Sequence, residues 1–221
     1  MDTSIDRVRF NMVQQQIRPW NVADERVLAV MGEIPRERFV PDEYRNLAYA
    51  DIEIPLGEGQ TMLAPKVVAH MLQALEIRAD DKILEIGTGT GYTTACLSRI
   101  GGRVVSIEIH AALAERARAT LQTLHLRPLE VRIGNGLAGP VDGRPFDVIA
   151  LTGSLPDDEA LGMLQEQLAT GGRLFVIVGE EPVMEAMVLR RTAGKYFRRE
   201  TLFETCVPPL EEAPEPKRFV F

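Results

Sequence analysis

The sequence is poor in cysteine and has no long apolar run. Its 221 residues include two cysteines, Cys96 and Cys206, which make neither a disulfide framework nor a zinc pattern. No apolar run approaches the roughly 18 residues that a membrane helix needs, and the N-terminus lacks the basic and apolar segments of a signal peptide. We therefore expect a protein of the reducing cytoplasm with no membrane partner.

Positive charge and histidine are also scarce. The 25 Lys and Arg residues stand against 32 Asp and Glu residues, which gives a formal net charge of −7. Because Lys and Arg contacts with phosphates dominate nucleic-acid binding, this charge argues against a nucleic-acid partner. The three histidines, His70, His110 and His125, are scattered without metal-ligand spacing, so we expect no metal site.

The chain length favours one well-filled domain. Apolar residues at helical spacing predict helices over residues 10–17, 24–31 and 65–75, and several prolines interrupt the stretch between the second and the third. We expect a single domain over residues 1–221, made of three parts. They are an N-terminal helical and active-site segment (1–78), a Rossmann-like core (79–207) and a C-terminal tail (208–221).

From residue 82 onward, short apolar runs alternate with helical patterns. The expected strands are residues 82–86, 103–108, 129–133, 146–151 and 173–178, and the expected helices are residues 92–100, 111–124 and 157–168. This alternation predicts right-handed crossovers and a largely parallel sheet. Two further strands, 186–191 and 196–207, are linked through Gly194-Lys195 and predict an antiparallel hairpin at the edge of that sheet.

The strongest chemical signal is a glycine loop after the first of these strands. Gly87, Gly89 and Gly91 lie at alternate positions, where a tight turn needs unusual dihedral angles and a ligand approaches the backbone closely. A nicotinamide-binding loop usually has the spacing G-x-G-x-x-G, but here Tyr92 occupies the place of its third glycine. Glu85, two residues before the first glycine, suits a ligand with a cationic amino group and poorly suits a pyrophosphate.

Polar side chains follow the next two strands. Glu108 ends the second strand, where a carboxylate can accept hydrogen bonds from both hydroxyls of a ribose. Gly134-Asn135-Gly136 follows the third strand, and the Asn135 amide can contact an adenine. The alternative explanation is a plain tight turn with a solvated glutamate, followed by an ordinary glycine turn. Together these features predict an S-adenosylmethionine-dependent methyltransferase with an α/β fold.

The sequence resembles the protein-L-isoaspartate O-methyltransferases over roughly residues 8 to 207. The segments that match in order and spacing are residues 35–41, 47–49, 54–61, 84–92, 146–149 and 171–174, of which 54–61 is similar to the segment that crosses the family's active site. The resemblance implies a Rossmann-like class I methyltransferase fold, with a mostly parallel seven-stranded sheet, a C-terminal antiparallel hairpin and helices on both faces. It also implies methyl transfer from S-adenosylmethionine to the α-carboxylate of isoaspartyl residues, which starts the repair of damaged proteins.

The resemblance also implies roles for individual residues. The cofactor loop, which holds the methionine end of S-adenosylmethionine, is formed by Glu85, Gly87, Thr88, Gly89, Gly91 and Tyr92. Glu108 is expected to hold the ribose, and Asn135 and Gly136 the adenine. Thr61 and Leu63 are expected to lie in the active-site segment.

Two positions depart from the family pattern. Leu63 stands where the family has its active-site serine, and Asn135 replaces the usual Asp. Because methyl transfer to an ionised carboxylate depends mainly on alignment and the exclusion of water, the missing hydroxyl need not abolish it. An isoaspartyl peptide is the preferred acceptor. A diverged methyltransferase with another acceptor, a cofactor-binding protein without isoaspartyl activity and, more remotely, a nicotinamide dehydrogenase stay open. The oligomeric state and the role of the tail also stay open.

Overall fold

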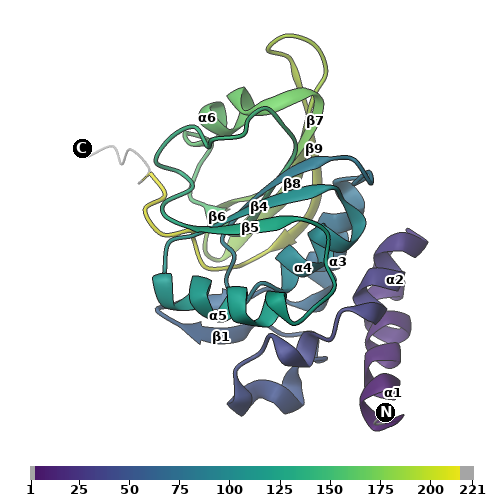
Figure 1. Ribbon diagram of the computed structural model, residues 1–221. Coiled ribbons are helices and arrows are strands. Elements are labelled where there is room, and N and C mark those ends of the chain that lie inside the picture. The colour runs from purple at the N-terminus through teal and green to yellow at the C-terminus, as the bar shows by residue number, and fades with distance from the viewer. Residues whose placement is uncertain (1–2, 215–221) are drawn as a thin grey trace.

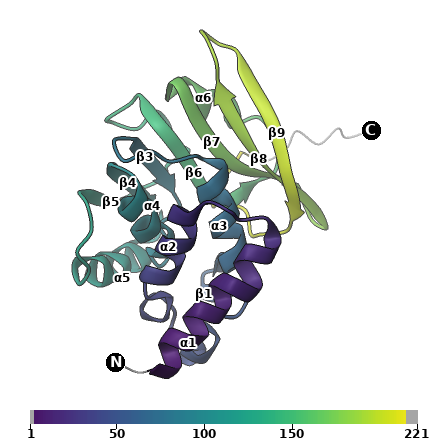
Figure 2. The ribbon, with the colours of Figure 1, turned by 90° about the vertical axis from the view of Figure 1, so that its right-hand side faces the viewer.

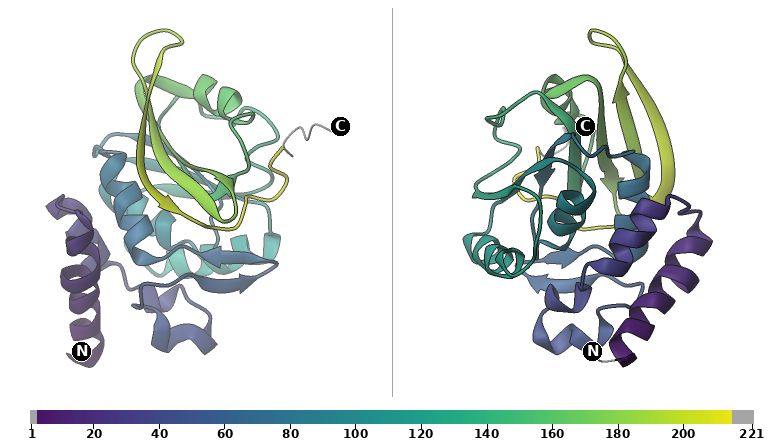
Figure 3. Two further views of the ribbon diagram at one scale, coloured as in Figure 1. Left: turned by 180° about the vertical axis from the view of Figure 1, so that it is seen from behind. Right: turned by 45° about the vertical axis from the view of Figure 1, so that its right-hand side comes forward.

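A seven-stranded sheet organises the computed structural model, which describes residues 3–214 (Figure 1). The strand order is β5-β4-β3-β6-β7-β8-β9. The strands are β3 (Lys82–Ile86), β4 (Arg103–Glu108), β5 (Leu129–Ile133), β6 (Phe146–Leu155), β7 (Leu168–Glu180), β8 (Val183–Arg191) and β9 (Phe197–Thr205). The strands from β5 to β7 pair in parallel, whereas β8 is antiparallel to both of its neighbours. The expected parallel sheet with a C-terminal antiparallel hairpin is therefore confirmed, and Figure 3 shows this hairpin projecting beyond the rest of the sheet.

Helices cover both faces of the sheet, as expected. Apolar side chains of α3 (Pro65–Ala74), α4 (Tyr92–Ile100) and α5 (Ala111–Gln122) share one buried cluster with Ile83 of β3. Leu84, the next residue along β3, points to the opposite face and packs in a second cluster with α6 (Leu161–Glu166). The period of two along the strand explains this division, because successive side chains of a strand face opposite sides.

The expected helix over residues 157–168 is shorter than the sequence suggested. Only Leu161–Glu166 is helical, and β7 already begins at Leu168, which pairs with Phe146 of β6. Both side chains are fully buried. Pairing with a buried neighbouring strand therefore outweighs the local helical preference at this end of the segment.

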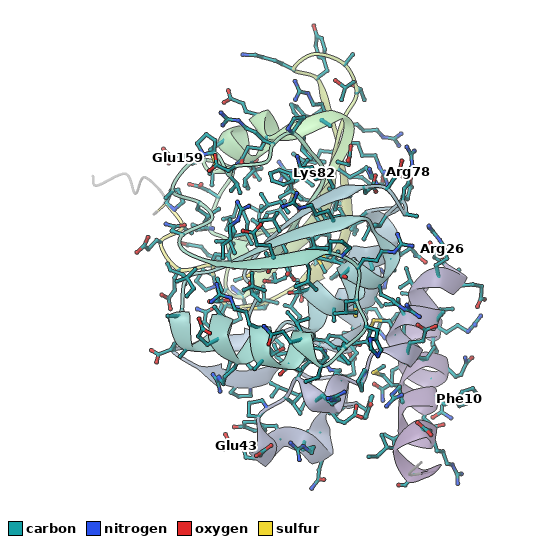
Figure 4. The ribbon with its side chains drawn as sticks, in the orientation of Figure 1. Phe10, Arg26, Glu43, Arg78, Lys82 and Glu159 are labelled. Carbon is teal, nitrogen blue, oxygen red and sulfur yellow. The ribbon has the colours of Figure 1, made fainter. Side chains whose placement is uncertain are left out.

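Helices of the N-terminal segment pack together beside α3 (Figure 2). α1 (Thr3–Asn11) continues through a π-helical turn at Met12–Ile17 and a 3-10 turn at Arg18–Trp20, and α2 (Glu25–Glu33) follows. The apolar face predicted for the helix over residues 10–17 is only partly buried. Val13 and Ile17 are buried, but Phe10 is 61% exposed and projects away from the sheet (Figure 4).

A small hairpin and the end of the chain complete the structure. Two short 3-10 helices, Arg36–Arg38 and Asp42–Leu47, lead into the antiparallel pair β1 (Ile54–Gly57) and β2 (Gln60–Met62). After β9 the chain, yellow in Figure 1, passes beside one end of the sheet, where Pro209 forms a bridge with Ser154. No helix among the described residues is long and apolar enough to cross a membrane.

Candidate functional site

The glycine loop lies between β3 and α4, with Gly87, Gly89 and Gly91 all at positive φ. At Gly87 the need for glycine is also steric, because a Cβ would lie 2.3 Å from the hydroxyl of Thr152 at the end of β6. That hydroxyl donates to the carbonyl oxygens of Ile86 and Gly87. Thr152 therefore fixes the start of the loop from the neighbouring strand.

A buried polar network supports the loop from behind. The Glu85 carboxyl is fully buried and accepts hydrogen bonds from Thr94 of α4 and Ser106 of β4. The Ser106 hydroxyl also contacts that of Thr88 at 2.5 Å, which ties the loop to the network. Burial, with a smaller contribution from the negative charge of Glu108, raises the pKa of Glu85 to about 8.

Four of the residues expected to hold the cofactor do not line the cavity that the loop borders: Glu85, Thr88, Gly91 and Tyr92. Glu85 does not line this cavity, because it faces α4 from the buried side of β3. The Tyr92 ring is buried against Phe39 and under the Arg36 guanidinium, with its centroid 4.7 Å from the guanidinium carbon. Both side chains hold the loop in place from behind, and their contact with the cofactor stays a prediction.

Glu108 lies at the centre of the cavity floor. It is 4% exposed at the end of β4, and its two carboxylate oxygens accept hydrogen bonds from the backbone N–H groups of Gly89 (2.7 Å) and His110 (3.0 Å). Two backbone donors fix the direction of the carboxylate, which keeps further lone pairs for hydroxyl groups of a ligand. This is the position expected for a ribose-binding carboxylate.

The cavity lining around Glu108 includes an apolar part with a polar edge, which we call the slot. Its apolar wall is made by Ile107, Ile109, Leu113 and Leu137. Gly136 forms part of the floor, where a Cβ would lie 2.8 Å from Ile86. Asn135 lies at the edge, and its side-chain oxygen accepts a hydrogen bond from the Leu137 N–H at 2.7 Å. A flat heteroaromatic base fits this combination of apolar faces and a polar edge.

The β1–β2 hairpin forms one wall of the cavity through Leu56, Gln60 and Thr61. The Thr61 hydroxyl donates to the Glu53 carboxylate at 2.7 Å, and burial raises the pKa of that carboxyl. The Leu63 side chain is 3% exposed and borders a smaller hollow shared with Thr61, Tyr92 and Thr152. The structure therefore brings Thr61 and Leu63 together beside the glycine loop, as the sequence predicts.

A buried arginine anchors this wall. Arg36 is fully buried, and it donates to the carbonyl oxygens of Ala48 (2.8 Å) and Leu63 (2.7 Å). Burial lowers the pKa of its guanidinium, and stacking over Tyr92 partly offsets the cost of burying the charge. The backbone at Leu63 is thereby fixed although its side chain carries no polar group.

The opposite wall comes from the C-terminal tail, whose role the sequence left open. Leu210 and Glu211 line the cavity together with His110, which contacts Glu211 at 2.8 Å. None of these three residues was expected at the site. For His110 a local signal existed, since it lies two residues after Glu108, but nothing local in the sequence indicates that residues 210–211 return to this place.

Floor and walls border a cavity that is open to solvent, with one acidic group at its floor. Among the residues that line it there is no lysine or arginine, and no three His, Cys, Asp or Glu residues among those described group as metal ligands. The arrangement can hold a nucleoside by its ribose and base, and it can align a second molecule beside Thr61 and Leu63.

Comparisons with known proteins agree with this geometry. The sequence model of the family Protein-L-isoaspartate(D-aspartate) O-methyltransferase (PCMT) matches residues 8–212. A protein-L-isoaspartate O-methyltransferase of Gloeobacter violaceus is 42% identical over 205 residues, which cover 92% of this chain and 99% of that protein. One from Koribacter versatilis is 43% identical over 195 residues, covering 88% and 86%.

Solved structures show the same similarity. A protein-L-isoaspartate O-methyltransferase superposes with a TM-score of 0.78 at 26% identity, covering 91% of this chain and 65% of the other. A Plasmodium falciparum structure, described as a beta-aspartate methyltransferase in complex with S-adenosyl-L-homocysteine, gives a TM-score of 0.79 at 17% identity. It covers 92% of this chain and 98% of its own, and it supports the fold alone.

Proposed function

The chain belongs to the protein-L-isoaspartate O-methyltransferase family, and we propose that it transfers the methyl group of S-adenosylmethionine to the carboxylate of isoaspartyl residues in proteins. The observation that carries the proposal is the position of Glu108. Its carboxylate is fixed by two backbone N–H groups in a cavity that Thr61 of the β1–β2 hairpin also lines.

The cavity residues fit S-adenosylmethionine. We propose that Glu108 accepts hydrogen bonds from the ribose hydroxyls, and that the slot closed by Asn135 and Gly136 takes the adenine. The missing side chain at Gly136 is consistent with this placement, because a Cβ there would lie 2.8 Å from Ile86, which also lines the cavity. Gly87 and Gly89 line the same cavity at its other end, and we assign the methionine end of the cofactor to them.

When bound, the cofactor supplies a methyl group on a sulfonium, which needs no activation by the protein. An isoaspartyl carboxylate is ionised at neutral pH, so no general base is required either. The task of this chain is therefore to align the acceptor oxygen and to exclude water. We propose that the β1–β2 hairpin does this, since it lies directly over the glycine loop.

Leu63 changes how the hairpin handles the acceptor. With no hydroxyl at this position, Thr61 carries the one hydroxyl of the segment 54–63, and in this structure its proton is donated to Glu53. The Arg36 contact with the Leu63 carbonyl holds the backbone in place despite the substitution. We propose that the position of the hairpin backbone, more than a serine hydroxyl, sets the geometry of the acceptor.

A methyl-transfer assay tests the proposal. Radiolabelled S-adenosylmethionine is incubated with the protein and either an isoaspartyl peptide or the same peptide with ordinary aspartate. We expect label on the isoaspartyl peptide alone. Label on neither peptide would remove the acceptor assignment, and calorimetric titration with S-adenosyl-L-homocysteine and NADH would then test the cofactor assignment separately.

We also propose that isoaspartyl-containing proteins are the partners of this chain, because the name of its family gives protein isoaspartate as the substrate. The division into segments 1–78, 79–207 and 208–221 and the cytoplasmic location stay predictions from the sequence.

A further inference from the structure

The end of the described chain forms a strap, residues 207–212, across the cofactor cavity. Its inner half is firmly attached to β6. The N–H of Ser154 donates to the Pro208 carbonyl (3.0 Å), the N–H of Leu210 donates to the Ser154 carbonyl (2.9 Å), and the Ser154 hydroxyl donates to the Val207 carbonyl (3.0 Å). Ser154 is fully buried, so these bonds are protected from water.

The outer half of the strap is held differently. Glu211 contacts the His110 imidazole at 2.8 Å, and Glu212 accepts a hydrogen bond from the Asn135 side-chain amide at 2.6 Å. Both contacts join side chains that are partly exposed, and such contacts contribute little to stability. Glu212 also has a φ of 57°, which a residue other than glycine adopts only when contacts hold it there.

The two residues that hold the outer half are part of the cofactor site. His110 and Asn135 both line the cavity, next to Glu108 and to the slot that we assign to the adenine. Leu210 reaches the glycine loop from the same strap, since a Cβ on Gly87 would lie 3.2 Å from its side chain. The strap and the β1–β2 hairpin thus both form walls of the cavity, and Leu210 of the strap reaches its glycine-loop end.

From these contacts we propose that Glu211 and Glu212 are positioning residues of the cofactor site, which act by closing the strap over bound adenosine. The inference rests on the proposed function, because it takes the cavity as the cofactor site. Ser154 fixes one end of the strap, and the contacts with His110 and Asn135 form a weak latch at the other. Opening the latch uncovers the slot, so cofactor and product exchange through this side.

The Asn135–Glu212 pair allows a test by exchange of donor and acceptor. In N135D, a carboxylate faces the Glu212 carboxylate across the same short distance, and their repulsion opens the latch. In N135D/E212Q, the glutamine amide donates to the new carboxylate, and the hydrogen bond is restored with its direction reversed. If N135D acted only on the cavity itself, the second substitution at Glu212 would not restore the native behaviour.

Surface plasmon resonance on the immobilised full-length chain, with S-adenosyl-L-homocysteine as the probe, gives association and dissociation rate constants. For N135D we expect both to rise about fivefold, the factor that corresponds to one net hydrogen bond. For N135D/E212Q we expect both to return toward the native values. N46D, at an exposed position of the 3-10 helix Asp42–Leu47 away from the cavity, adds the same charge by the same substitution and should change neither.

Three outcomes would overturn the proposal. They are unchanged rates in N135D, a rise in the dissociation rate alone, and no rescue in N135D/E212Q. The second would mean that the strap is a fixed wall. The binding of S-adenosyl-L-homocysteine to the native chain is measured separately. If the native chain does not bind it, the cofactor assignment itself is wrong.

Discussion

The floor and the walls of the cavity are built in different ways. The floor is built on the carboxyl ends of β3, β4 and β6. Glu108 lines the cavity, and the floor includes the buried layer beneath the cavity surface, where Glu85 and Ser106 are bonded to neighbouring elements. The walls are the β1–β2 hairpin and the strap. Each has one buried anchor, at Arg36 and at Ser154, but the side-chain contacts of Thr61, Glu211 and Glu212 are partly exposed.

This difference suggests a division of labour. A buried network with fixed backbone donors is rigid, so the floor sets where the cofactor binds. Regions with few buried contacts open locally at low free-energy cost, so the walls can move for exchange and for the acceptor. Floor substitutions should therefore alter stability and cofactor affinity, and wall substitutions should alter rates and acceptor use.

The largest effect is expected for Glu85→Gln, which removes a buried titrating group from the floor. Since the pKa of Glu85 in the folded protein is about 8 and its ordinary value is 4.5, the folded state keeps the proton that the unfolded state loses in this range. Native stability therefore falls as pH rises from about 4.5 to about 8, whereas the glutamine does not titrate. Between the two ends of this pH range, the free energy of unfolding of the variant therefore rises by about 4 kcal/mol relative to that of the native protein.

Urea denaturation at pH 5 and at pH 8.5 measures that gain. The comparison variant is Glu53→Gln in the wall, where burial also raises the pKa but the carboxyl is only half-buried. We expect a clearly smaller gain there. Equal gains in both variants would mean that floor and wall carboxyls experience the same environment, and the distinction between the regions would fail.

A second floor prediction concerns cofactor affinity. Glu108→Ala removes the proposed ribose acceptor and leaves the Gly89 and His110 N–H groups without their partner. Hydrogen bonds to a charged group contribute about 2–3 kcal/mol, so we expect the Kd for S-adenosyl-L-homocysteine to rise roughly 30- to 150-fold. Isothermal titration calorimetry measures it, with Glu130→Ala on exposed β5 as the control. A change below about threefold would place the ribose elsewhere.

The difference between the floor and the walls also explains which features of the site the sequence could predict. The bounds of β3, β4 and β5 agree with the expectation, because each is a short apolar run closed by turn residues. The glycine loop and Glu108 lie on the ends of these strands, so a local pattern was enough to bring them together.

Features that depend on distant parts of the chain were missed. His110 and Glu211 are 101 residues apart in the sequence, and no periodicity connects them. The hydrogen bond of Glu85 with Thr94 of α4 was likewise not expected, and the contact of Glu85 with the cofactor stays a prediction from its position in the motif. The overlong helix at 157–168 has the same origin, since strand pairing with β6 decides where it ends.

The smallest effect is expected in the wall, at Thr61. Thr61→Val keeps the shape of the side chain and removes the hydroxyl that donates to Glu53. If the hairpin serves the acceptor alone, kcat/KM for an isoaspartyl peptide should fall about fivefold, the value of one net hydrogen bond, while the Kd for S-adenosyl-L-homocysteine stays unchanged. Glu53→Gln provides the matched control, because its amide oxygen can still accept the threonine proton, and it should retain most of the activity. Should Thr61→Val weaken cofactor binding as much as it lowers turnover, the hairpin would belong to the cofactor site like the floor, and the two regions would no longer have separate tasks.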